Sequence, residues 1–325
     1  KGAATVATVS GFTVQGPVPD EQSVAGIHVR DGASATIENN TVTSMINSGN
    51  TDFLKIKYGM IVGETDAFSP YGHSMDASRE FGFATVRNNT FSQIQNTAIA
   101  VCGYGTQATV SNNDLTGFGP NFAKANFGIF VRDKAKVSVT GNTVRNYSYN
   151  QATSPAFWAS GIGVWYGAAD NITIQNNTLT DNMVGVIIES TSGVKVLNNT
   201  ISVSSAFNHP SISPKGIGVE TDPYGRECLD IARIGCASNN VLVQGNTITG
   251  VGAGYGIYVN PPHEETNNYM RGDVSGEISN NVISGWATGF LNEVSAVSSH
   301  SIAFSGNVVK NSGSYALRNK DTNAT

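Results

Sequence analysis

Ile172-Thr-Ile-Gln-Asn-Asn-Thr-Leu179 is the stretch that decides the fold, because the chain repeats its pattern many times. The next copy, Val194-Lys-Val-Leu-Asn-Asn-Thr-Ile201, follows after 22 residues. Apolar and polar residues alternate on both sides of the asparagine pair, which predicts two short strands that each bury one face and meet at a sharp corner. The second asparagine of each copy is Asn40, Asn89, Asn113, Asn142, Asn177, Asn199, Asn246, Asn281 or Asn307.

A second phrase, Gly-Ile-x-Val, precedes the asparagine phrase and predicts a third strand. It begins at Gly26, Gly128, Gly161, Gly216 and Gly256. The connections are too short and too regular for crossover helices, whereas coiling lets each strand pair in parallel with its equivalent one coil further on. We therefore predict an all-β fold, a single-stranded right-handed parallel β-helix of about ten coils.

The asparagine pair has a structural explanation. Asparagine tolerates the left-handed backbone that a sharp corner between two strands requires. Asparagines stacked at the same corner of every coil can hydrogen-bond to the coils above and below, so we expect an asparagine ladder. N-glycosylation is the alternative for five asparagines that begin an Asn-x-Thr pattern, although we expect most of them to lie inside the ladder. These five are Asn39, Asn88, Asn171, Asn176 and Asn198.

Composition and charge exclude several classes of protein. Only 13% of the 325 residues are charged and 36 are glycine, which favours a β protein with many tight turns over a helical bundle. With a net charge of -5 and no basic face, a nucleic-acid partner is not expected. No apolar stretch reaches the roughly 18 residues of a membrane span. We expect residues 1–325 to form one domain, trimmed from a longer protein at both ends and able to self-associate end to end or side by side.

The combined pattern, Gly-Ile-x-Val followed by Thr-Ile-x-Asn-Asn-Thr-Ile, resembles the pectin-lyase-like superfamily of right-handed β-helices over nearly the whole chain. That superfamily includes polysaccharide lyases, glycoside hydrolases, uronan epimerases, phage tailspikes and cell-surface proteins. The resemblance implies the fold and leaves these functions open. Residues 71–76, Tyr71-Gly-His-Ser-Met-Asp76, contain letters similar to a uronan epimerase signature but in a different order, so that site is not carried over.

Glycan sites in this superfamily usually lie along the outer face of the Gly-Ile-x-Val strand. If the glycine is position zero, positions one and three point inward and positions two and four point outward. Outward neighbours in successive coils are one strand spacing apart, about 4.8 Å. Position two reads His28, Ile61, Ala100, Phe130, Gly163, Ile187, Gly218, Tyr258 and Leu291. Position four reads Arg30, Gly63, Cys102, Arg132, Trp165, Glu189, Glu220, Asn260 and Glu293.

The middle of the position-four row predicts a reactive site. Two neighbouring carboxylates such as Glu189 and Glu220 either share a proton or bind a cation. A pair about 5 Å apart matches a retaining glycosidase, and together with Asp222 the same pair could bind Ca²⁺. We expect Glu189 and Glu220 to act as an acid/base pair or as cation ligands, with Arg132 as charge stabiliser and either no cofactor or Ca²⁺. The alternative is that all of these are ordinary exposed residues of a solenoid.

Further residues complete the predicted site. Trp165, Tyr258 and Phe130 offer flat faces on which sugar rings can stack, and His28, Arg30 and Asn260 are additional substrate-binding candidates. Insertions on both flanks of the strand predict the walls of a groove. These insertions span 46–58, 119–127, 148–160 and 203–215 before the strand, and 63–83, 221–239 and 260–275 after it.

The cysteines indicate the compartment. Cys228 and Cys236 lie eight residues apart and could form a disulfide, which fits an oxidising environment. Together with the resemblance and the outward rows described above, this compartment leads us to expect a secreted or cell-surface protein. We expect it to bind a polysaccharide or cell-surface glycan and to process it as a lyase or glycoside hydrolase. The acidic groove favours a neutral glycan, or an acidic one bound through Ca²⁺. The alternative is a non-catalytic cell-surface, adhesin or fibre segment.

Overall fold

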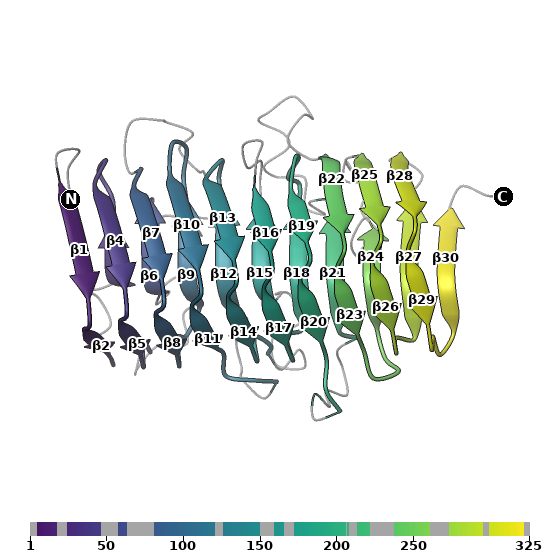
Figure 1. Cartoon of the computed structure of the whole chain (residues 1–325), viewed down its shortest axis with the longest axis horizontal. Coiled ribbons are helices and arrows are strands. Elements are labelled where there is room, and N and C mark those ends of the chain that lie inside the picture. Colours follow the sequence, from purple (N-terminus) through teal and green to yellow (C-terminus); the bar gives the residue numbers. More distant parts are fainter. Residues whose placement is uncertain are drawn as a thin grey trace, which may run out of the picture.

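The computed structural model shows a solenoid of stacked coils (Figure 1). It describes residues 5–17, 25–46, 58–63, 81–120, 126–149, 159–165, 172–205, 207, 213–221, 237–260, 273–294 and 299–321. These residues form three parallel sheets of ten strands each, in which every strand pairs with its equivalent in the next coil. The predicted right-handed parallel β-helix is confirmed. Across the described residues, no helix is long and apolar enough to span a membrane.

Each sheet takes its name from its first strand. The β1 sheet contains β1 (Val6–Ser10), β4 (Ser34–Glu38), β7 (Phe83–Arg87), β10 (Gln107–Ser111), β13 (Lys136–Thr140), β16 (Thr173–Gln175), β19 (Lys195–Leu197), β22 (Ser238–Gln244), β25 (Val274–Ser279) and β28 (His300–Ser305). The β2 sheet contains β2 (Thr13–Gln15), β5 (Thr41–Thr43), β8 (Thr90–Ser92), β11 (Asp114–Thr116), β14 (Thr143–Arg145), β17 (Thr178–Thr180), β20 (Thr200–Ser202), β23 (Thr247–Thr249), β26 (Val282–Ser284) and β29 (Val308–Lys310). The β3 sheet contains β3 (Ala25–Val29), β6 (Tyr58–Gly63), β9 (Thr97–Cys102), β12 (Phe127–Arg132), β15 (Ser160–Trp165), β18 (Val184–Glu189), β21 (Lys215–Glu220), β24 (Tyr255–Asn260), β27 (Thr288–Val294) and β30 (Tyr315–Asp321).

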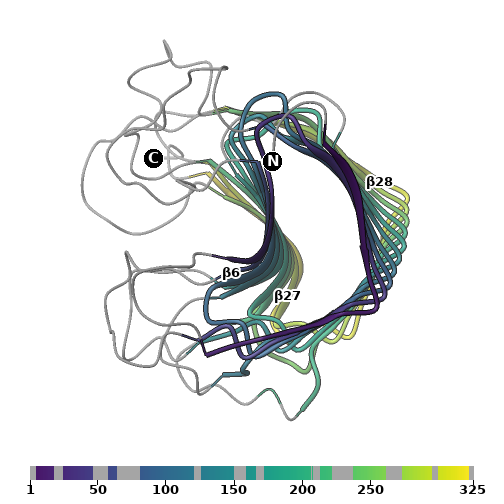
Figure 2. The ribbon, with the colours of Figure 1, turned by 90° about the vertical axis from the view of Figure 1, so that its left-hand side faces the viewer.

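Viewed along the coil axis, the three sheets surround a continuous core (Figure 2). One coil illustrates the arrangement: Val110 from β10, Leu115 from β11 and Ile129 from β12 all lie fully buried in the same cluster. Burying each such side chain stabilises the fold by about 1.5–3 kcal/mol. Because every coil repeats this inward set, the alternation in the sequence is sufficient to build the core.

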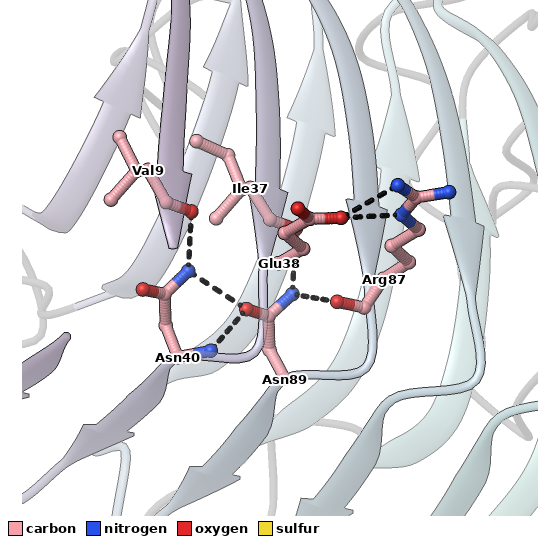
Figure 3. Close-up of polar contacts among 6 residues, drawn as sticks. All are labelled: Val9, Ile37, Glu38, Asn40, Arg87 and Asn89. Carbon is pink, nitrogen blue, oxygen red and sulfur yellow. Dashed lines mark hydrogen bonds and ion pairs between the residues drawn. The ribbon is translucent and has the colours of Figure 1, made fainter. Parts of the chain in front are cut away.

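The asparagine ladder is confirmed from Asn40 to Asn307. The backbone N–H and the Nδ2 of Asn40 both donate to Oδ1 of Asn89, at 2.9 and 3.0 Å (Figure 3). The same two bonds link every later pair of rungs. Each Nδ2 also reaches back to a strand carbonyl, for example from Asn40 to Val9 at 2.8 Å and from Asn89 to Ile37 at 2.9 Å.

The two positions of each asparagine pair have different roles. The second residue forms the ladder, whereas the first adopts a positive φ, 57° at Asn39 and 55° at Asn176. This left-handed backbone is accessible to asparagine and glycine, which explains why both residues occur at the first position. The first-position residues with a positive φ are Asn39, Asn88, Asn112, Gly141, Asn176, Asn198, Gly245, Asn280 and Gly306.

This division corrects the expectation that the Asn-x-Thr asparagines lie inside the ladder. Asn39, Asn88, Asn176 and Asn198 are exposed at the corner, because each is the first residue of its pair. The side chains that enter the ladder belong to the residues that follow them. Asn171 lies outside the described residues.

Candidate functional site

The outer face of the β3 sheet carries the predicted position-four row in the predicted order. Arg132 pairs with Trp165, and Trp165 pairs with Glu189. Glu189 pairs with Glu220, which in turn pairs with Asn260. Neighbours in this row are separated by one strand spacing, about 4.8 Å. Residues from five successive coils therefore occupy equivalent register positions across the sheet.

The position-two row runs parallel to this line, and its register is also as predicted. It places Phe130, Gly163, Ile187, Gly218 and Tyr258 on successive strands.

His28 and Arg30 lie at the start of the sheet, away from the carboxylate pair. Three strand spacings, roughly 14 Å, separate the β3 strand from β12, which carries Arg132. Nε2 of His28 is 2.8 Å from the carbonyl oxygen of Gly63, and Nε of Arg30 is 3.7 Å from the Asp31 carboxylate. These two residues therefore form a separate region from the pair Glu189 and Glu220.

Three aromatic side chains pack together beside Arg132. Phe130 is fully buried and stacks on Phe127, with ring centroids 4.7 Å apart. Trp165 lies edge-on to both rings, at 5.5 Å from Phe127 and 5.0 Å from Phe130. Trp165 is the partly exposed member of this cluster, and its contacts with the two buried phenylalanines fix the orientation of the indole.

The three charged side chains in the middle of the row are buried rather than exposed. Arg132 and Glu189 are each 4% exposed, and Glu220 is 1% exposed. Ordinary outward residues of a solenoid remain solvated, because burying a charge is costly unless it is paired. Nε of Arg132 lies 3.4 Å from the Asp133 carboxylate. This burial distinguishes the face from a plain solvent-exposed sheet.

Lys215 is a member of the site that the sequence did not reveal. Its Nζ donates to Oε1 of Glu220 at 3.1 Å and lies 4.3 Å from the centre of the Tyr258 ring. Counting from Gly216 by strict alternation places Lys215 inward. In the structure Gly216 faces the core, since a Cβ on it would meet the core side chain of Ile248 at 2.4 Å. The alternation therefore breaks at Gly216, and Lys215 faces outward.

The same break brings the residue before the glycine to the outer face in other coils. Phe127, for example, precedes Gly128 and contacts the outer-face rings of Phe130 and Trp165. The sequence signal for this third outward row is therefore the residue directly before each Gly-Ile-x-Val phrase. In register it reads Phe127, Ser160, Val184, Lys215 and Tyr255.

Several predicted features lie outside the described residues. They include Asp222, both cysteines of the predicted disulfide, Cys228 and Cys236, and most of the insertions that would form the groove walls. Within the described ranges, no three His, Cys, Asp or Glu side chains gather closely enough to hold a metal ion. Cys102 packs in a small outer-face cluster with Tyr58, as expected of a small buried side chain.

Comparison with known proteins identifies the scaffold. The family described as "Right handed beta helix region" matches residues 1–201, more than half of the chain. No curated protein matches the chain in sequence.

Similar solved structures share only a low sequence identity with the chain. The periplasmic alginate epimerase AlgG has a TM-score of 0.44 and 16% identity, with 84% of this chain and 60% of that chain covered. PfbA, a surface adhesin of Streptococcus pneumoniae, has a TM-score of 0.37 and 12% identity over 97% of this chain and 86% of that chain. The A-module of the Azotobacter vinelandii mannuronan C-5 epimerase AlgE6 has a TM-score of 0.33 and 14% identity over 100% and 82%. This chain therefore spans 60% of the length of AlgG.

Proposed function

The chain belongs to the right-handed β-helix family, and we propose that it binds an extracellular polysaccharide along the outer face of the β3 sheet and processes it as a lyase or glycoside hydrolase. One observation carries the proposal. The register of the β3 sheet lines up Arg132, Trp165, Glu189 and Glu220 on consecutive strands, and the three charged members are nearly fully buried.

The two carboxylates are the proposed reactive groups. Glu189 and Glu220 are direct register partners on strands about 4.8 Å apart, and retaining glycoside hydrolysis uses a carboxyl pair about 5–5.5 Å apart. In that reaction one carboxylic acid protonates the leaving oxygen and the other carboxylate attacks the sugar. Arg132, two strands from Glu189, would stabilise negative charge that develops on the substrate.

Aromatic side chains would bind the sugar rings. The indole of Trp165 is partly exposed and is fixed by Phe127 and Phe130, which reduces the entropy lost when a ring stacks on it. Tyr258 lies on the other side of the carboxylate pair, on β24. Subsites on both flanks of a reactive pair suit a chain-like ligand better than a small molecule.

A non-catalytic surface or fibre role is the second candidate, because the aromatic side chains of the β3 sheet could bind a sugar chain without any reaction at Glu189 and Glu220. Both candidates imply a secreted or cell-surface location.

A glycan panel separates the two candidates. Neutral and uronate-containing polysaccharides are incubated with the protein, with and without Ca²⁺, and new reducing ends and unsaturated-uronate absorbance are measured. Glu189→Gln and Glu220→Gln should each abolish turnover, whereas Glu277→Gln, an exposed glutamate on the β1 sheet, should leave it unchanged. The enzyme proposal fails if no glycan is turned over and the Glu189→Gln/Glu220→Gln variant binds glycans as the wild type does.

A further inference from the structure

The outer face of the β3 sheet carries a cation of its own. Nζ of Lys215 lies 3.1 Å from Oε1 of Glu220, and the two side chains are 10% and 1% exposed. We propose that this ammonium group is the resident cation of the site: it fills the place beside Glu220 that a divalent ion would otherwise take, and the site binds its glycan without a metal. The glycan part of this inference rests on the proposed function, whereas the cation part does not.

The backbone of β21 is shaped for this ion pair. Lys215 and Glu220 lie at opposite ends of the strand, which rises about 3.3 Å per residue, so both side chains must extend toward each other over Gly218. A Cβ at Gly218 would stand 3.2 Å from Oε1 of Glu220. The neighbouring strands carry Ile187 and Tyr258 at the same position, so glycine on β21 leaves the space in which the two charges meet.

The ammonium group also contacts an aromatic ring. The Tyr258 ring lies 4.3 Å from Nζ, a distance at which an aromatic face attracts a cation. Because Glu220 is almost fully buried, it would be strongly destabilised without an adjacent positive charge. Lys215 supplies that charge from the same strand.

A divalent ion would compete with Lys215 for the same oxygens. Ca²⁺ binds carboxylate oxygens, and within the described part of the sheet the candidates are Oε1 of Glu220 and the carboxylate of its register partner Glu189. An ammonium group 3.1 Å from one of these oxygens repels a second cation. Removing the ammonium group while keeping both carboxylates should therefore convert the site into one that binds divalent or trivalent cations.

The test measures cation binding in the absence of any glycan. Tb³⁺ luminescence, sensitised by the aromatic side chains of the site, and calorimetry with Ca²⁺ are applied to the full chain and its variants. Lys215→Met should bind Tb³⁺ on the order of ten-fold more tightly than the wild type, and adding Glu220→Gln should remove the gain. Lys215→Arg keeps the positive charge and should show no gain.

Two outcomes would overturn the proposal. The first is a wild-type cation site that disappears in Glu220→Gln, because Lys215 would then not occupy that place. The second is a folded Lys215→Met, with an unchanged circular dichroism spectrum, that gains no cation binding. Lys215→Gln, which keeps a long polar side chain, provides the same test if the methionine variant does not fold. Because no glycan is present, a failed glycan panel leaves this result unaffected and counts against the proposed function alone.

Discussion

The Asn177→Ala substitution removes one interior rung of the asparagine ladder, and the structure sets its expected cost. Asn177 is 1% exposed. Its Oδ1 accepts from the backbone N–H and the Nδ2 of Asn142, at 2.9 and 3.0 Å. Its Nδ2 donates to the carbonyl oxygen of Val139 at 3.0 Å and to Oδ1 of Asn199 at 2.9 Å. Alanine removes all four hydrogen bonds and leaves the Asn142 N–H buried without its acceptor.

At about 1 kcal/mol for each hydrogen bond, the loss in unfolding free energy should be about 4 kcal/mol. Asn307→Ala is the matched control, because Asn307 also makes four hydrogen bonds through its amide group. Asn307 is only partly buried, however, so water can replace its partners. We expect about 1 kcal/mol for this terminal rung.

Equilibrium unfolding in urea, followed by far-ultraviolet circular dichroism, measures both losses. Because repeat proteins can unfold coil by coil, hydrogen exchange of the Asn142 amide provides a local readout. That amide should exchange much faster in Asn177→Ala than in the wild type. Equal losses for Asn177→Ala and Asn307→Ala, or an unchanged exchange rate at Asn142, would refute the assignment of stability to buried rungs.

Three further predictions concern the backbone and the response to pH. Gly216→Ala would place a Cβ 2.4 Å from a backbone carbonyl oxygen in the next coil, whereas the nearest atom to a Cβ in Gly313→Ala is 3.7 Å away. The thermal midpoint of Gly216→Ala should therefore fall well below that of Gly313→Ala. Equal midpoints would contradict this packing. Asn176→Ala forces alanine to a φ of 55° and should cost about 1 kcal/mol in urea unfolding, whereas Asn176→Gly should cost less than alanine. Burial lowers the pKa of His300, against the opposing effect of Asp273, so the unfolded chain takes up a proton at a higher pH than the folded one. Stability should therefore be lost as pH falls from about 6.5 toward the lower pKa of the folded state, and His300→Gln should lose less stability over that range in pH-dependent urea unfolding.

Most of the fold follows from two short phrases in the sequence. The period-two alternation specifies which side chains enter the core, and the asparagine pair marks the same corner of every coil. Together they fix the register, so that the lateral pairing of Glu189 with Glu220 follows from counting residues. A strand shifted by one residue would expose its apolar side chains, which makes this kind of inference reliable for β-helices.

The chemistry of the site was less accessible to sequence reasoning. Lys215 was missed because the alternation breaks at Gly216, a backbone effect that a residue pattern does not encode. The burial of Glu220 depends on the side chains that surround it in three dimensions. The exposure of Asn176 also depends on backbone geometry, because the first asparagine of a pair adopts a positive φ and lies exposed, whereas the second enters the ladder.

The uniform corners have a consequence for how such a protein changes over evolutionary time. Asn177 and Asn199 mark equivalent points in successive coils, so deleting residues 178–199 would remove one complete coil and let the ladder close again. The interior would keep its pattern, but Trp165 would become the neighbour of Glu220. Duplication or loss of whole coils can therefore create new combinations of outward side chains while the inherited scaffold stays intact.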